Sequence, residues 1–174
     1  QTFHIAITQP ATLDFQENST SLTIHPNIHV LGGSSQTVTT ATVTIDNTNF
    51  KQYEDALIYE PITFNYFTEN EVTVTGSYNR SNGTLTLLGN ATAEQYEIAL
   101  SRVQYINKSD NPTDVDKTVN FEVTYSGDGS PTAVGSRDVN IIPVDDTPIP
   151  VRSGPGFSLH FDGLDDFVEV PWDS

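Results

Sequence analysis

Residues 83–112 read GTLTLLGNATAEQYEIALSRVQYINKSDNP and contain the pattern from which the fold can be predicted. Leu85 and Leu87 alternate with threonines, which predicts a strand with one buried face. Residues 93–100 are good helix formers, and Thr92 stands before them as an N-cap with a glutamine three residues later, the spacing of a capping box. We therefore predict a strand followed by one short helix, whose apolar side covers the end of a β-sandwich.

The same alternation of apolar and polar residues recurs on both sides of this stretch. It is found at residues 3–7, 38–45, 72–74, 121–125 and 139–141. Clusters of glycine, proline, asparagine and serine separate these segments and predict turns between strands. The composition agrees, because threonine, valine, isoleucine and the aromatic residues, which favour strands, outnumber the long-chain helix formers. We predict an all-β sandwich.

The charge of the chain limits its classes of partner. Seven lysine and arginine residues stand against 23 acidic residues, which gives a formal net charge of -16. This charge repels phosphate backbones, so nucleic acid is not a predicted partner. Carboxylates at this density either form a solvated surface or bind hard cations that take oxygen ligands, such as calcium. The absence of cysteine excludes disulfides, zinc–cysteine sites and a thiol nucleophile.

In a eukaryotic protein, five Asn-x-Ser/Thr sequences indicate a secretory route, with N-linked glycans and an extracellular or cell-surface location, whereas in a bacterial protein they carry no such information. Their asparagines are Asn18, Asn79, Asn82, Asn90 and Asn107. No apolar run is long enough for a transmembrane helix, so we predict no membrane insertion within this chain. Its first residue opens a strand-like stretch with no signal peptide before it, which is typical of a processed or excerpted chain.

The two ends of the chain predict its domain organisation. Residues 1–9 form an alternating segment followed by proline, and a similar segment with a following proline closes the main region. We predict that residues 1–9 are the last strand of a preceding repeat and that residues 10–146 are the sandwich. Residues 147–155 are rich in proline and glycine and predict a stiff linker. A new domain is expected to begin at residues 156–174.

Residues 83–89, 93–100 and 103–112, in this order, resemble the cadherin-like repeats of large microbial and eukaryotic surface proteins. Further along, an Asp-Gly turn at Asp128 and the sequence DDTP from Asp145 stand where that family has an Asp-Gly turn and an Asn-Asp-x-Pro linker. The resemblance covers about residues 10–148. It implies an immunoglobulin-like Greek-key sandwich that acts as a spacer and adhesion module.

The sequence FSLHFDGLDDFVEVP at residues 157–171 resembles the opening strands of laminin G-like, or concanavalin A-like, jelly-roll domains. This second resemblance implies that the new domain is the start of a jelly roll. It also supports an alternative function, a carbohydrate-binding, lectin-like protein that uses this domain.

The cadherin-like resemblance implies bound calcium at the joints between domains, where clustered carboxylates would otherwise repel one another. The residues that match the family's ligands are Asp145, Asp146, Glu17 and Asp128. Pro143 stands where cadherins have another aspartate, so the resemblance implies a single, weaker calcium site.

No catalytic residue is predicted, and we expect the protein not to be an enzyme. Asp162, Asp165 and Asp166 fall in a turn between two strands, where no acid and base can be assigned. His25 and His29 lack a third ligand for zinc.

The predicted function is therefore that of an extracellular structural or adhesion module, a calcium-associated spacer in a multidomain surface or filament protein. Its expected partners are neighbouring domains or copies of the same protein, and glycans. A hydrolase accessory module is a third, weaker alternative. Terminal strands from incomplete domains would also leave open edges, which suggests strand exchange with neighbouring subunits.

Overall fold

The computed structural model describes residues 5–6, 12–30, 37–65, 71–127, 132–145, 150–151 and 158–159, with the backbone alone for 5–6, 132–134, 150–151 and 158–159. Its elements in chain order are β1 (Ile5–Ala6), β2 (Thr12–Gln16), β3 (Leu22–Thr23), β4 (His29–Val30), β5 (Val38–Ile45), β6 (Asp55–Ile58), β7 (Ile62–Phe64), β8 (Val72–Asn79), β9 (Thr84–Ala91), α1 (Ala93–Leu100), β10 (Gln104–Asn107), β11 (Lys117–Tyr125), β12 (Thr132–Ile142), β13 (Pro150–Val151) and β14 (Ser158–Leu159).

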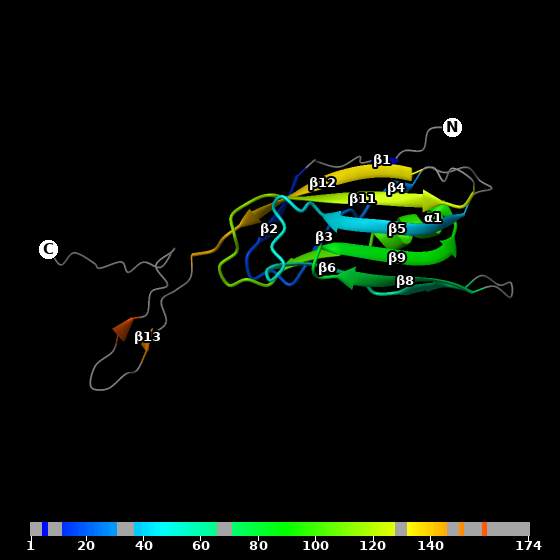
Figure 1. Ribbon diagram of the computed structural model, residues 1–174. Helices are drawn as coiled ribbons and strands as arrows, with labels where there is room; N and C mark the ends of the chain where they lie inside the picture. The colour runs from blue at the N-terminus through cyan, green and yellow to red at the C-terminus, as the bar shows by residue number, and fades with distance from the viewer. Residues whose placement is uncertain are drawn as a thin grey trace. The chain divides into compact units, whose positions relative to one another are not determined.

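The chain divides into two compact units, Gln1–Ile142 and Pro143–Ser174. In the second unit the described strands β13 and β14 pair antiparallel. The first unit contains all the other described elements, and its main sheet has seven strands in the order β2-β12-β11-β5-β9-β8-β7 (Figure 1). The fold is therefore mostly β, as the alternating sequence predicts.

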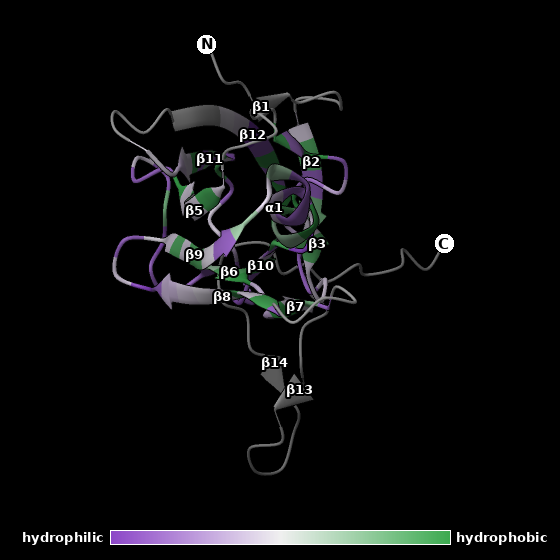
Figure 2. Ribbon diagram, turned by 90° about the vertical axis from the view of Figure 1, so that its right-hand side faces the viewer, coloured by the Kyte–Doolittle hydropathy of each residue, from purple (hydrophilic) through white to green (hydrophobic). Residues whose placement is uncertain are grey.

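The seven-stranded sheet is mixed. β2 runs parallel to β12 over five residue pairs, and the other neighbouring strands are antiparallel. The sheet curls, and α1 lies on its concave side together with a smaller sheet in the order β3-β10-β6 (Figure 2). This second layer allows the inner face of the large sheet to be buried.

The core follows the predicted alternation. In β5 every second residue from Ala41 to Ile45 is buried, and the intervening threonines are half-buried. β9 and β11 repeat the pattern, with Leu87 and Phe121 fully buried. From the small sheet, Tyr105 packs edge-on against Phe15 of β2, with ring centroids 5.1 Å apart. Aromatic contacts of this kind connect the two layers in addition to aliphatic packing.

The helix and its cap are confirmed. The Thr92 hydroxyl accepts a hydrogen bond from the Gln95 backbone N–H at 3.2 Å, and the Gln95 side-chain oxygen accepts one from the Thr92 N–H at 2.8 Å. Two of the amides that a helix N-terminus leaves unsatisfied thus have partners. Tyr96 and Leu100 are fully buried, and the Tyr96 hydroxyl donates to the Gly89 carbonyl at 2.8 Å.

The turn between β8 and β9 is also where the sequence predicts it. Gly83 has a φ of +67° and lies directly under the ring of Phe50, so that a Cβ at this position would lie 2.9 Å from ring carbons. The backbone conformation and the close aromatic contact both require glycine here.

The strands described near the two ends of the chain are paired, which bears on the prediction of strand exchange. β1 pairs with β4 inside the first unit, and β13 pairs with β14, so these terminal strands are paired within the chain and the premise of strand exchange is not met. The cadherin-like Greek-key connection remains a prediction, and residues 156–174 lie outside the described residues except for β14. Among the described residues, no helix has the length and apolar character needed to cross a bilayer.

The capping box generates a first prediction. Thr92→Ala removes the hydroxyl acceptor and should lower the free energy of unfolding by about 1 kcal/mol. Thr92→Ser keeps the acceptor and should cost much less. Urea unfolding monitored by circular dichroism would measure both, and an equal loss in the two variants would rule out the cap as the cause.

Candidate functional site

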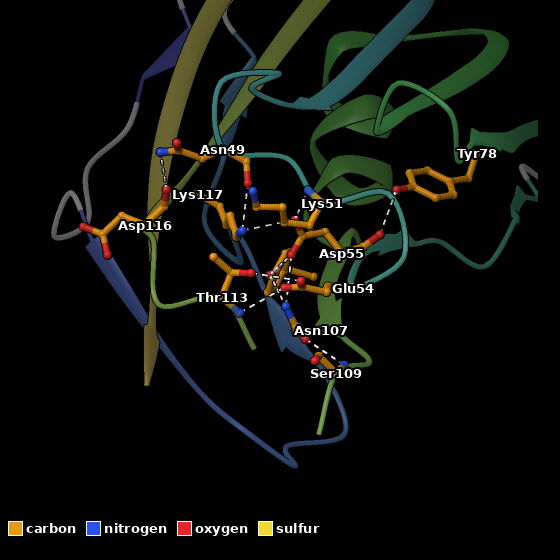
Figure 3. A network of polar contacts seen from close by, with 11 residues as sticks. Asn49, Lys51, Glu54, Asp55, Tyr78, Asn107, Ser109, Thr113, Asp116 and Lys117 are labelled. Carbon is orange, nitrogen blue, oxygen red and sulfur yellow. Dashed lines mark hydrogen bonds and ion pairs between the residues drawn. The ribbon is translucent and has the colours of Figure 1, made fainter. Parts of the chain in front are cut away.

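The most extensive polar cluster in the described part of the chain is buried between β6, β10 and β11. Its centre is an ion pair between Lys117 and Asp55, with Nζ and Oδ2 3.3 Å apart and both side chains fully buried. The Lys117 ammonium also donates to the Asn49 carbonyl at 2.8 Å. Figure 3 shows this network from close by.

The Asp55 carboxylate has a donor on each oxygen besides the lysine. Oδ2 accepts the Lys51 backbone N–H at 2.7 Å, and Oδ1 accepts the Tyr105 hydroxyl at 2.6 Å and the Asn107 side-chain amide at 3.1 Å. A buried carboxylate needs this degree of satisfaction, because an uncompensated charge in the interior is very costly. Burial, and next the negative charge of Asp55, raise the pKa of Tyr105 far above its ordinary range, so that its hydroxyl stays a donor.

The loops around the pair are attached to it. Glu54, the neighbour of Asp55, accepts the Thr113 hydroxyl at 2.9 Å and the Thr113 N–H at 3.0 Å. The Asn49 side chain donates to the Asp116 carbonyl at 2.8 Å. Because these groups are engaged inside the protein, the cluster cannot present them to a substrate. What it does chemically is hold two loops and three strands in one arrangement.

Of the four predicted calcium ligands, two lie among the described residues, and these two belong to different units. Glu17 is buried just after β2, and its N–H donates to the Ile142 carbonyl at 2.9 Å. Asp145 is exposed and belongs to the second unit. Asp128 and Asp146 lie outside the described residues. Within the described ranges, which include only Glu17 and Asp145 of the four, no three His, Asp or Glu side chains form a group that could hold a metal ion.

The predicted glycosylation sites separate into two groups. Asn18, Asn79, Asn82 and Asn90 are exposed, as a glycan acceptor must be. Asn107 is only 7% exposed, and its side-chain nitrogen donates to Asp55 and, at 3.4 Å, to the Tyr105 hydroxyl. A glycan on this nitrogen could not coexist with these contacts, so the structure argues against Asn107 as an acceptor. Asn107 thus meets the sequence requirement for glycosylation, but its side chain is buried and engaged in hydrogen bonds.

The two histidines considered as zinc ligands lie in different environments. His25 is fully buried with its ring edge-on to Phe121, and neither ring nitrogen makes a hydrogen bond to another described residue. His29 is exposed, and its Nδ1 lies 3.6 Å from the Glu97 carboxylate. Burial, and next the positive charge of Arg137, lower the pKa of His25 below its ordinary value. The folded protein therefore keeps this imidazole neutral at pH 7.

Comparison with known proteins identifies no family. No protein-family model matches the chain, and a search of curated proteins found no match to it.

The segment that contains Asp162, Asp165 and Asp166 lies outside the described residues. The lectin-like alternative depends on the same segment and stays a prediction.

The buried ion pair generates a second prediction. Lys117→Met leaves the Asp55 carboxylate uncompensated and should cost about 3–5 kcal/mol of unfolding free energy. Asp55→Asn leaves the buried Lys117 ammonium without its carboxylate and should also be strongly destabilising. The double variant removes both charges and should cost clearly less than the sum of the two single changes, measured by urea unfolding. Additive costs within about 0.5 kcal/mol would show that the two groups are not coupled.

A third prediction concerns His25 and pH. The unfolded chain takes up a proton near pH 6.5, whereas the lowered pKa keeps the folded chain from doing so until a lower pH. The difference in His25 protonation therefore costs no stability above about pH 6.5. Below that value the free energy of unfolding falls with the pH, by at most about 1.4 kcal/mol per pH unit.

Thermal and urea unfolding of the protein and of His25→Leu between pH 7 and pH 5 would test this. The difference in unfolding free energy between the two proteins should change over this range in favour of the leucine variant. A constant difference would show that His25 does not titrate differently in the folded and unfolded chains. His29→Gln serves as the exposed control.

Proposed function

We propose that this chain is a non-enzymatic structural and adhesion module of an extracellular or cell-surface protein, in which it acts as a spacer between neighbouring domains. The observation that carries the proposal is the saturated Lys117–Asp55 network, whose polar groups hold loops and strands of the first unit in place. A spacer has to keep its shape, and this use of buried charge suits that requirement better than it suits catalysis.

Two further observations support the proposal. The exposed asparagines Asn18, Asn79, Asn82 and Asn90 fit a glycosylated surface. The backbone bond from Glu17 to Ile142 lies at the end of the first unit, where the chain continues to Pro143. This bond fixes the end of the long strand β12 against the segment that follows β2.

Calcium is the part of the proposal that comes from the sequence resemblance. A cation held by oxygen ligands would neutralise part of the -16 charge and stiffen the region around Asp145 and Asp146. Among the described candidates, Glu17 and Asp145 have the required chemistry. The resemblance suggests a weak extracellular site, with a dissociation constant of about 0.1–1 mM.

The fourth prediction is a calcium titration of the full chain by calorimetry and thermal unfolding. A site with a dissociation constant of about 0.1 mM should raise stability by about 1.4 kcal/mol at about 1 mM calcium. Asp145→Ala or Asp146→Ala removes the side-chain oxygen ligands and should abolish the rise, whereas Asp114→Ala, at an exposed acidic residue elsewhere, should not. An equal rise with magnesium, or none with either ion, would remove calcium from the proposal and leave a metal-free spacer.

A further inference from the structure

The exposed positive charges of this acidic protein are few, and they are unevenly placed. Among the described residues Lys117 and Arg137 are buried, and the solvent-facing cations are Lys51, Arg80, Arg102 and Lys108. Three of these four, Arg80, Arg102 and Lys108, line two hollows that both include Ile58 of β6. We call these two the β6 hollows.

The smaller of the β6 hollows has a volume of about 180 Å³, and the larger of about 350 Å³. The smaller is lined by Tyr53, Tyr78, Arg80 and Lys108 among others. The larger is lined by one cation, Arg102, and by Thr23, Tyr59, Glu60, Ser101 and Gln104. Ile58 lines both hollows. Each hollow thus combines tyrosine and a guanidinium group, and polar side chains surround them.

The cations of the β6 hollows have no acidic partner in the described part of the chain. Neither of the ion pairs His29–Glu97 and Lys117–Asp55 includes one of these cations. Glu60 lines the same hollow as Arg102 without pairing with it. In a chain with 23 acidic residues, arginine and lysine side chains that lack an acidic partner and lie around β6 indicate a surface that accepts an anion from outside.

An aromatic ring lies beside these charges. Tyr53 is 77% exposed, and the Arg80 guanidinium lies 5.2 Å from the centre of its ring. Arg80 is fixed further by a hydrogen bond of 3.0 Å from its Nε to the Gln52 carbonyl. A flat ring with a fixed guanidinium at its face can pack against the apolar side of a sugar ring while the guanidinium binds a carboxylate or sulfate.

The edge of β6 is less suited to an added peptide strand. β6 is an edge strand of its sheet. Its Asp55 carbonyl, however, already accepts a hydrogen bond of 3.3 Å from the Tyr78 hydroxyl, which points toward it in Figure 3. The Tyr59 hydroxyl binds the Val74 carbonyl at 3.0 Å and ties the next residue after β6 to β8. A ligand would therefore be recognised through the side chains of the hollows and not through strand addition.

We propose that the β6 hollows bind an acidic oligosaccharide, with its carboxylate or sulfate groups on Arg80, Lys108 and Arg102 and a sugar ring against Tyr53. The inference gives the proposed adhesion module a class of ligand, and it rests on that proposal only for the extracellular setting. Calcium has no part in this site.

The test is isothermal titration of the full chain, in a calcium chelator, with an oligogalacturonate, a heparin-derived oligosaccharide and a neutral maltooligosaccharide. The first two distinguish carboxylate from sulfate as the anionic group. We expect at least one acidic probe to bind, with an affinity that falls as salt is raised, and the neutral probe not to bind. Because the chelator removes calcium, failure here would not bear on the calcium titration.

Charge-removing variants locate the site. Arg80→Gln and Lys108→Gln should each weaken binding about tenfold, the loss expected for one hydrogen bond to a charged group. Lys51→Gln removes an exposed charge of the same sign outside the hollows and should leave the affinity unchanged. All three residues are exposed, so unfolding temperatures close to that of the parent protein are expected and would be checked first.

Three results would overturn the proposal. The first is no binding of either acidic probe at physiological ionic strength. The second is an equal loss in Lys51→Gln and Arg80→Gln, which would indicate unspecific attraction. The third is equal or tighter binding of a polyglutamate peptide, which would assign the hollows to an acidic polypeptide.

Discussion

The buried lysine at the start of β11 is the constraint on which this end of the protein depends. An ammonium group with no exposure to solvent must have its charge compensated, and here one carboxylate and one backbone carbonyl do so. The carboxylate in turn requires donors, which come from Tyr105, Asn107 and the backbone of Lys51. Each requirement thus fixes another segment, until β6, β10, β11 and their loops share one arrangement.

The strands and the helix were predictable because their signals are local. Alternation along β5, β9 and β11 follows from the two faces of a strand, and the Thr92–Gln95 cap depends on residues only three apart. The pairing of Lys117 with Asp55 joins residues far apart in the sequence, and no pattern around either one indicates it. Asn107 shows the same limit, since a sequon records neighbours along the chain and not the carboxylate beside it in space.

The net charge of the chain likewise does not show which residues are neighbours in space. The net value of -16 is a count, and it correctly describes the surface as acidic on average. The net charge does not show that three of the four exposed cations among the described residues lie around one short strand, while two other cations are buried. A site that depends on where charges gather, and not on how many there are, becomes visible only once the fold is known. The calcium ligands have the opposite character, because sequence position alone suggests them, and only Glu17 and Asp145 of the four lie among the described residues.

The parallel pairing of β2 with β12 has a mechanical consequence. The two strands lie side by side and point the same way, with Asn140 bonded across to Asp14 at 2.9 Å. β2 lies near the beginning of the first unit and β12 closes it, so tension applied through the chain draws them in opposite directions along their length. Their hydrogen bonds are then loaded in shear, and all five residue pairs must yield together instead of opening one after another. Hydrogen bonds loaded together in shear resist a stretching force better than the same number of bonds opened one at a time.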